Sequence, residues 1–335
     1  MLDLTTTVWV GTIGLIVGLF VLDLVVSTRN PHAVGFREAV AWSVFYISVA
    51  IGFGVWFTQY AGSEFGAQYF AGYIVEKSLS VDNLFVFVII MTAFAVPAAY
   101  QHRVLTYGIA MALVLRAIFI AIGAALLAAF SFMFVIFGAI LIFTAIKLFQ
   151  HRNEDPDVKD NGLVRITRRL VPVSPEYDKG RLTTKIDGRF AVTPLFIVLV
   201  AIGGTDILFA LDSIPAVFGV TEEAYIVFTA NAFALLGLRA LFFLVKGLLD
   251  RLVYLSVGLS LILAFIGVKL ILHFLHGIEP SVPEIETSVS LAVIVVVLFI
   301  TTVASLIKVR RDPTAVAHAG SLKAHDPQDE SSSGT

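Results

Sequence analysis

Apolar runs of about twenty residues recur from one end of this chain to the other, and they constrain its fold more than any other feature. A helix of that length crosses a hydrocarbon core about 30 Å thick. Hydrophobic residues make up 58% of the 335 residues and charged residues only 14%, unlike the balance of a soluble domain. The sequence therefore predicts an all-α, polytopic membrane protein.

The apolar runs predict about nine transmembrane helices. The expected spans are residues 8–26, 37–58, 71–96, 104–127, 130–149, 191–216, 223–245, 252–275 and 288–307. Lys and Arg fall in alternate connections only, and the remaining connections, 59–70, 128–129, 217–222 and 276–287, contain neither. The positive-inside rule then places the N-terminus outside and the C-terminus in the cytoplasm, an alternation that eight or ten spans would break.

The segment 150–190 is expected to be a cytoplasmic loop with some structure of its own. Residues 163–171 predict a short basic amphipathic helix on the inner leaflet, and residues 181–192 predict a hairpin around Asp187 and Gly188. The alternative is an ordinary connector whose basic residues only fix the topology. The tail 309–335 is expected to be a disordered cytoplasmic segment.

An internal repeat organises the spans. Leu-Arg-Ala-Ile-Phe around Arg116 returns as Leu-Arg-Ala-Leu-Phe around Arg239, and the spans that follow end alike at Lys147 and Lys269. Residues 71–149 and 191–275 are therefore expected to be two copies of a three-helix unit. Because three is odd, the copies enter the membrane from opposite sides, as in many secondary transporters. Two helices within 1–58 and one at 288–308 would flank this core.

Each repeat contains an acidic signature within an apolar span. Glu76 is followed by Asp82 and Asn83, and Asp206 by Asp212 and Ser213. Carboxylates at membrane depth are expensive, so the default interpretation is a functional site. A buried ion-pair network that only holds the bundle together is the alternative, although desolvation makes such pairs poor stabilisers.

The spacing of the acids limits how one ion could bind. Residues six apart on a regular helix differ by roughly 240° in azimuth, so the two carboxylates of one signature do not share a face. Either the helices unwind locally, or the acids form successive stations along a path. Gly203, Gly204 and Pro215 favour a broken helix in the second signature, whereas the first is compatible with a straight helix.

The residues around these acids offer oxygen ligands. The candidate metal ligands are Glu76, Asp82, Asn83, Asp206, Asp212 and Ser213, with Thr205 and Asn231 as further candidates. The chain has no cysteine, and oxygen-only coordination suits a hard cation such as Mn²⁺, Ca²⁺ or Mg²⁺. Four carboxylates against the charge partners Arg116 and Arg239 leave a charge of about −2, which a divalent cation would neutralise.

Several of these residues have a structural alternative. Arg116 and Arg239 are explained equally well as fixed partners of the carboxylates or as residues that gate the path directly. Asn231 is explained equally well as a tie between helices or as a ligand. Lys77 is expected to extend to the outer end of its span. Asp23 is expected to pair with Arg29 at the inner end of the first span.

The two acidic signatures, 76–87 and 205–216, resemble the paired signatures of the TerC/Alx family of bacterial membrane proteins. The Leu-Arg-Ala segments and Pro172-Val-Ser-Pro175 with Tyr177 resemble it too, so that the likeness covers about residues 8–308. The resemblance implies a multispan protein of the bacterial inner membrane, from a family linked to tellurite resistance and with members described as Mn²⁺ exporters. The family's acidic positions correspond to Glu76, Asp82, Asp206 and Asp212.

These observations lead to one functional hypothesis and one competitor. We expect a transporter that exports Mn²⁺ or a similar hard divalent cation through an acidic site between the repeats, with no bound cofactor. The competitor is a non-transporting scaffold or component of a tellurite or metal-stress resistance system, in which 150–190 binds a cytosolic partner. No nucleophile-and-base motif or nucleic-acid-binding surface is evident, so neither an enzyme nor a nucleic-acid-binding protein is expected.

Overall fold

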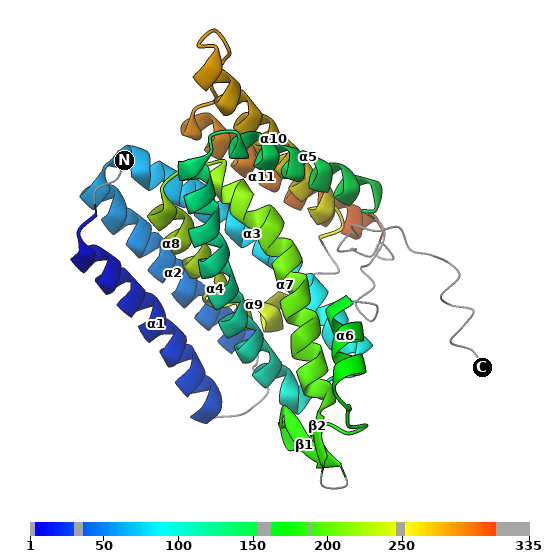
Figure 1. Ribbon diagram of the computed structural model, residues 1–335. Helices are drawn as coiled ribbons and strands as arrows, with labels where there is room; N and C mark the ends of the chain where they lie inside the picture. The colour runs from blue at the N-terminus through cyan, green and yellow to red at the C-terminus, as the bar shows by residue number, and fades with distance from the viewer. Residues whose placement is uncertain (1–3, 30–35, 153–161, 187–188, 246–251, 313–335) are drawn as a thin grey trace.

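The computed structural model describes residues 4–29, 36–152, 162–186, 189–245 and 252–312, which are helical almost throughout (Figure 1). The helices are α1 (Thr6–Arg29), α2 (Phe36–Ala61), α3 (Ser63–Ala93), α4 (Ala98–Ala129), α5 (Met133–Gln150), α6 (Gly162–Leu170), α7 (Pro194–Phe218), α8 (Ala224–Leu235), α9 (Leu238–Val245), α10 (Leu255–Ile278) and α11 (Thr287–Arg311). A 3-10 turn, η1 (Asp178–Gly180), and two strands, β1 (Thr183–Ile186) and β2 (Arg189–Val192), lie between α6 and α7. The predicted all-α class is confirmed.

Seven of the helices are long and apolar enough to cross a bilayer, namely α1, α2, α4, α5, α7, α10 and α11. α3 has the length, at 31 residues, but it carries Glu76, Lys77 and Asp82 in its middle. α8 and α9, at 12 and 8 residues, are each too short to span alone. The protein is therefore a multi-pass membrane protein.

Every expected span overlaps a helix. The expected helix break in the second acidic signature is absent, and a break lies instead within the span expected at 223–245. The range 223–245 contains two helices, α8 and α9, separated by Leu236 and Gly237. Gly237 has φ +79°, a conformation that favours glycine, and a Cβ there would meet the ring of Tyr46 at 2.7 Å. The chain therefore breaks between α8 and α9.

The expectation of a broken helix in the second acidic signature is wrong, because α7 runs without interruption from Pro194 to Phe218. Gly203 serves close packing instead, since an added Cβ would meet the methyl carbon of Met111 on α4 at 2.7 Å. Pro215 lies in the last turn, where its missing N–H removes a single hydrogen bond. A helix in lipid keeps its remaining backbone bonds because no water can replace them.

α3 is the element around which the bundle is built. It packs against α2, α7, α8 and α11. Buried residues of α3 belong to all three apolar clusters of the core. Val75 lies in the cluster that α3 shares with α5, α7 and α10, and Leu84 lies in the cluster that it shares with α4 and α7. Tyr69 lies in the cluster that it shares with α1, α2 and α8. The acidic signature of α3 therefore lies at the centre of the molecule.

α5 and α10 make the most extensive helix–helix contact of the fold, and α11 packs beside α10. In Figure 1 these three helices lie together across the end of the bundle that is farther from the strands. Gly138 of α5 and Gly267 of α10 bring the backbones together, because a Cβ on either would meet the carbonyl oxygen of the other at 2.7–2.8 Å. Small residues at such a crossing are the usual means of close helix packing in membranes.

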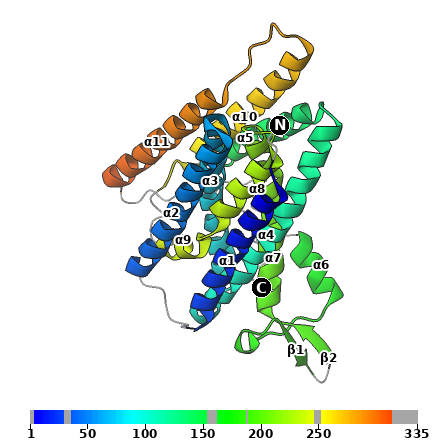
Figure 2. The ribbon, with the colours of Figure 1, turned by 90° about the vertical axis from the view of Figure 1, so that its left-hand side faces the viewer.

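The segment between α5 and α7 folds against the opposite end of the bundle, as Figure 2 shows for α6 and the strands. β1 and β2 form the predicted antiparallel hairpin, with Thr183 opposite Val192, and α6 is the predicted amphipathic helix. The Tyr177 hydroxyl donates a hydrogen bond to the Phe94 carbonyl, and Arg103 donates one to the carbonyl of Gly180. These bonds tie the segment to the ends of α3 and α4.

Some sequence-based expectations fall outside the described residues. These include Asp187 and Gly188 of the hairpin turn and residues 313–335 of the predicted tail. Within the described part, α11 continues to Arg311, four residues beyond the expected end of the last span.

Candidate functional site

Two predicted site residues from different helices meet at one buried arginine. Glu76 of α3 and Asp206 of α7 are 0% and 2% exposed, and Arg116 of α4 is 0% exposed. Arg116 Nη1 donates a hydrogen bond to Glu76 Oε1, and Nη2 lies 3.4 Å from Asp206 Oδ1. The first acids of the two signatures therefore share a single guanidinium, as the prediction of a common site requires.

Asn83 extends this cluster along α3. With its amide oriented to satisfy both ends, its oxygen accepts a hydrogen bond from Arg116 Nη2 at 2.8 Å and its nitrogen donates to the Leu79 carbonyl at 3.0 Å. Asn83 is seven residues after Glu76, and this spacing places both on one face of the helix. The predicted shared face is therefore the face turned toward Arg116.

Polar atoms around the cluster are left without partners. Glu76 Oε2 and Asp206 Oδ2 are buried and have no hydrogen-bond partner among the described residues. The same is true of Ser213 Oγ and Asn231 Nδ2. Buried carboxylate oxygens that accept no hydrogen bond carry a large desolvation cost, and each needs an explanation.

The second signature places its two acids in different surroundings. Asp212 accepts a hydrogen bond of 3.0 Å from Thr144 Oγ1 of α5, whereas Asp206 faces Arg116 on α4. Because α7 is continuous, this separation follows from the spacing of six residues. Thr205, a further candidate ligand, donates its hydroxyl hydrogen to the Ala201 carbonyl of its own helix.

One predicted ligand cannot be placed. The backbone of Asp82 belongs to α3, but its side chain lies outside the described residues. Among the residues that are described, no group of three or more His, Asp or Glu side chains is arranged to hold a metal ion. The described acids Asp206 and Asp212 therefore lie against different helices rather than in one cluster.

Arg239 has a different partner from the one expected. Its Nη2 donates to Asp23 Oδ1 of α1 at 2.9 Å, and the Tyr46 hydroxyl of α2 donates to the same oxygen at 3.1 Å. Arg239 therefore pairs with an acid of α1 and not with the acids of the two signatures, which corrects its expected role as their charge partner. The side chain of Arg29, the expected partner of Asp23, lies outside the described residues.

The charge balance of the site changes accordingly. With Arg239 neutralised by Asp23, the described cluster holds two carboxylates, Glu76 and Asp206, against one guanidinium, Arg116. If both acids are ionised, the cluster carries a charge of −1 before Asp212 and Asp82 are counted. The described cluster therefore has a charge different from the expected −2, and it depends on one arginine instead of two.

Lys77 has a place that the sequence did not predict. Instead of extending to the end of its span, its ammonium donates to the Ala234 carbonyl at 3.0 Å, in the last turn of α8 just before the break. A cation near a helix C-terminus is stabilised by the unsatisfied carbonyls there. Gly237 is the only local signal for that break, and nothing in the sequence links it to Lys77.

The sequence profile described as "Integral membrane protein TerC family" matches residues 61–313. An uncharacterized membrane protein of Myxococcus xanthus is 45% identical over 311 residues, which cover 93% of this chain and 95% of that one. An uncharacterized membrane protein of Mycobacterium tuberculosis is 46% identical over 326 residues, covering 93% and 82%. The chloroplastic thylakoid membrane protein TERC of Arabidopsis thaliana is 43% identical over 251 residues, covering 74% and 65%. No solved structure matches the chain.

Proposed function

The chain belongs to the integral membrane protein TerC family, and from that premise we propose that it is a transporter, not an enzyme, that exports a hard divalent cation, with Mn²⁺ as the leading candidate. The ion would leave the cytoplasm across a bacterial inner membrane, with the N-terminus outside and the C-terminus inside.

The observation that carries the proposal is the pair of buried acids on separate helices. Glu76 and Asp206 share Arg116, and each keeps one buried oxygen without a hydrogen-bond partner in the described structure. A purely structural ion-pair network would be expected to satisfy these atoms, because each costs about 1–3 kcal/mol or more when left unpaired. Oxygens in this state are suited to accept a passing cation.

The chemistry of the surrounding atoms supports a hard ion. Carboxylate and amide oxygens of Glu76, Asp206 and Asn83 meet at Arg116, and the chain supplies no thiolate. Oxygen donors of this kind prefer Mn²⁺, Mg²⁺ or Ca²⁺ over softer metals. The cation is the substrate here, and its positive charge would offset the negative charge of the acids while it is bound.

The continuous helices favour stations over a single cage. Glu76 and Asp206 would form one station beside Arg116, and Asp212 with Ser213 another, nearer α5. Asp82 would belong to the path at its level on α3. An acid that binds a proton at one station would link export to a proton gradient.

The test is manganese tolerance in a bacterial strain that lacks its own exporter. We expect each of Glu76→Gln, Asp206→Asn, Asp82→Asn and Asp212→Asn to lower Mn²⁺ efflux by roughly 10- to 100-fold. Glu64→Gln is the matched control, because Glu64 is an exposed residue in the first turn of the same helix. Normal tolerance with all four acidic variants, at equal expression, would rule out the site.

Uptake into inverted membrane vesicles then identifies the ion and its coupling. Mn²⁺, Ca²⁺, Mg²⁺ and Zn²⁺ are compared with and without a pH gradient, using wild type, Asp206→Asn and Glu64→Gln. Faster uptake of Zn²⁺ than of Mn²⁺ would contradict the assignment of a hard cation. Equal uptake with and without the gradient would exclude proton coupling.

The competing scaffold function is favoured by one observation on α6. Leu163, Ile166 and Leu170 leave an apolar stripe on its surface, with Leu170 76% exposed. If this stripe binds a cytosolic partner, Ile166→Glu with Leu170→Glu should abolish metal-stress resistance while ion flux in vesicles stays normal. If the acidic variants lose both metal-stress resistance and ion flux, and the α6 variant loses neither, the result supports the transporter.

A further inference from the structure

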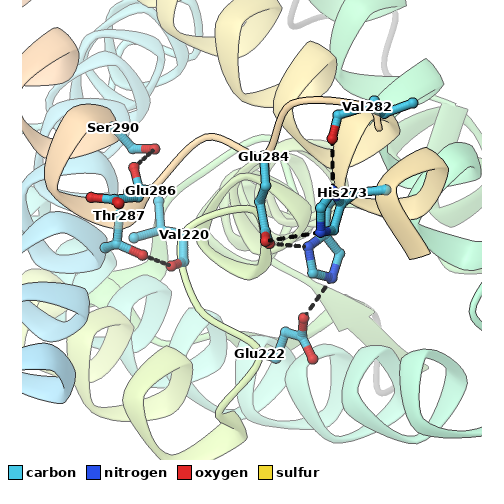
Figure 3. Close-up of polar contacts among 9 residues, drawn as sticks. Val220, Glu222, His273, Val282, Glu284, Glu286, Thr287 and Ser290 are labelled. Atoms are coloured by element: carbon cyan, nitrogen blue, oxygen red, sulfur yellow. Dashed lines mark hydrogen bonds and ion pairs between the residues drawn. The ribbon is translucent and has the colours of Figure 1, made fainter. Parts of the chain in front are cut away.

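A second cluster of ionisable residues lies away from the acids, at the end of the molecule opposite the hairpin. His273 of α10 lies between Glu222 of the α7–α8 connection and Glu284 of the α10–α11 connection (Figure 3). Its Nε2 is 2.8 Å from Glu222 Oε1, and its Nδ1 is 2.8 Å from Glu284 Oε1. One imidazole therefore joins α10 and the connection that follows it to the α7–α8 connection, which is distant in sequence.

The two contacts place a requirement on the charge of the ring. A carboxylate only accepts hydrogen bonds, and a neutral imidazole has one N–H to donate. Both bonds can be charge-assisted hydrogen bonds only when His273 carries a proton on each nitrogen. When the ring is neutral, one of its nitrogens faces a carboxylate oxygen, and that contact becomes repulsive.

The connection that Glu222 belongs to leads directly to the candidate site. It joins the C-terminal end of α7 to the N-terminal end of α8. The helix α7 carries Asp206 and Asp212, and α8 carries Asn231. Thr287 at the start of α11 also donates a hydrogen bond of 3.4 Å to the Val220 carbonyl of this connection (Figure 3). A change at His273 would therefore alter how firmly the segment between two site-bearing helices is held.

We propose that His273 is a protonation-dependent latch, which in its charged form ties the α7–α8 connection to α10 and to the α10–α11 connection. Loss of the proton leaves one N–H for two carboxylates, which weakens the tie between Glu222 and Glu284 and loosens this end of α7 and α8. By the predicted orientation this end is extracytoplasmic, so acid outside the cell would close it. Only the consequence for transport rests on the proposed function; the latch itself is independent of it.

The other charged groups near the ring are few. On α10 itself, His276 has its Nε2 3.9 Å from Glu284 Oε2, and Lys269 lies four residues before the ring. Glu223 adjoins Glu222, and Glu279 and Glu286 lie in or at the end of the α10–α11 connection. From α5 the ring meets the edge of Phe134, with centroids 4.9 Å apart, which adds no charge. The hydrogen bond from His273 also lowers the pKa of Glu222, against the opposing effect of burial.

The test uses the absence of cysteine from the sequence. Val220→Cys places a single thiol within the α7–α8 connection, at a side chain that is 3% exposed. We measure its labelling by a membrane-impermeant maleimide, with the full chain in vesicles, at about pH 5 and about pH 8, on either side of the ordinary imidazole pKa. Rates are divided by those of an exposed control thiol, Ser281→Cys, to remove the pH dependence of the reagent.

We expect normalised labelling to be about three- to tenfold faster at the higher pH, because two partly exposed ion pairs are lost. His273→Gln should label fast at both values, whereas His151→Gln, which removes an imidazole near the opposite end of α5, should keep the wild-type difference. Glu222→Gln should raise labelling at the lower pH. Equal labelling of the Val220→Cys protein at both values, or a pH dependence that disappears with His276→Gln but not with His273→Gln, would overturn the latch. Because labelling needs no transport, failure of the export assay leaves this result unaffected.

Discussion

At the residue scale, Arg116 supplies the positive charge that faces two buried acids. It is fully buried and it is the described cationic partner of both Glu76 and Asp206. Removing one partner of a buried ion pair leaves an uncompensated charge and is strongly destabilising. The integrity of the site and the stability of the bundle therefore depend on the same side chain.

We predict that Arg116→Gln lowers the free energy of unfolding by about 3–5 kcal/mol, because two buried carboxylates lose their counter-charge. The measurement is thermal unfolding of the purified protein in detergent. The matched control is Arg310→Gln, which removes an exposed arginine from the last turn of α11. Combining Arg116→Gln with Glu76→Gln and Asp206→Asn should recover part of the loss. Unchanged unfolding of Arg116→Gln would show that the acids do not depend on it.

Residue types were predictable from the sequence, whereas their partners were not. Glu76, Asp206 and Arg116 were identified because charge inside an apolar run is costly wherever it lies. Arg239 has the same local sequence as Arg116, yet it pairs with Asp23 on a helix outside the repeats. Which acid an arginine reaches depends on the azimuth and packing of helices that are distant in the chain, and local sequence does not encode this.

At the scale of elements, whether a glycine interrupts a helix depends on the side chain that packs against it. Gly203 and Gly237 both lie in apolar stretches, but only Gly237 interrupts a helix. Gly203 lies against Met111 in a continuous α7, while Gly237 lies against Tyr46 with a positive φ. The helices were predictable because lipid forces every backbone group to bond within its own segment. The position of the break was not, because it depends on the neighbouring helix.

We predict that Gly138→Ala destabilises the protein by about 1–3 kcal/mol, since the new methyl group would lie 2.7 Å from the Gly267 carbonyl oxygen and force α5 away from α10. The control is Gly14→Ala in α1, where a Cβ meets nothing within 4 Å. Thermal unfolding compares the two variants. An equal effect of both substitutions would mean that the α5–α10 crossing tolerates separation.

At the scale of the whole molecule, the two ends of the bundle differ in chemistry. One end carries α6 and the hairpin, with the exposed basic residues Arg168, Arg169 and Arg189. The other carries the α7–α8 and α10–α11 connections, with Glu222 and Glu284. By the positive-inside rule, this asymmetry predicts that the basic end faces the cytoplasm.

We predict that single cysteines at the two ends are labelled from opposite sides of the membrane. Ser281→Cys in the α10–α11 connection should react with an impermeant maleimide in intact cells. Thr183→Cys in β1 should react only in inverted vesicles. Both side chains are exposed, so burial does not limit either reaction. Labelling of Thr183→Cys in intact cells would reverse the predicted orientation.

The contact between Asp23 and Arg239 also bears on how the polypeptide is made. These residues are 216 positions apart, so the ribosome delivers α1 to the translocon long before the codon for Arg239 is read. During that interval the nascent first helix holds an acid without its eventual counter-ion. The ion pair can form only after α9 has emerged, and the docking of the first helix is incomplete until then.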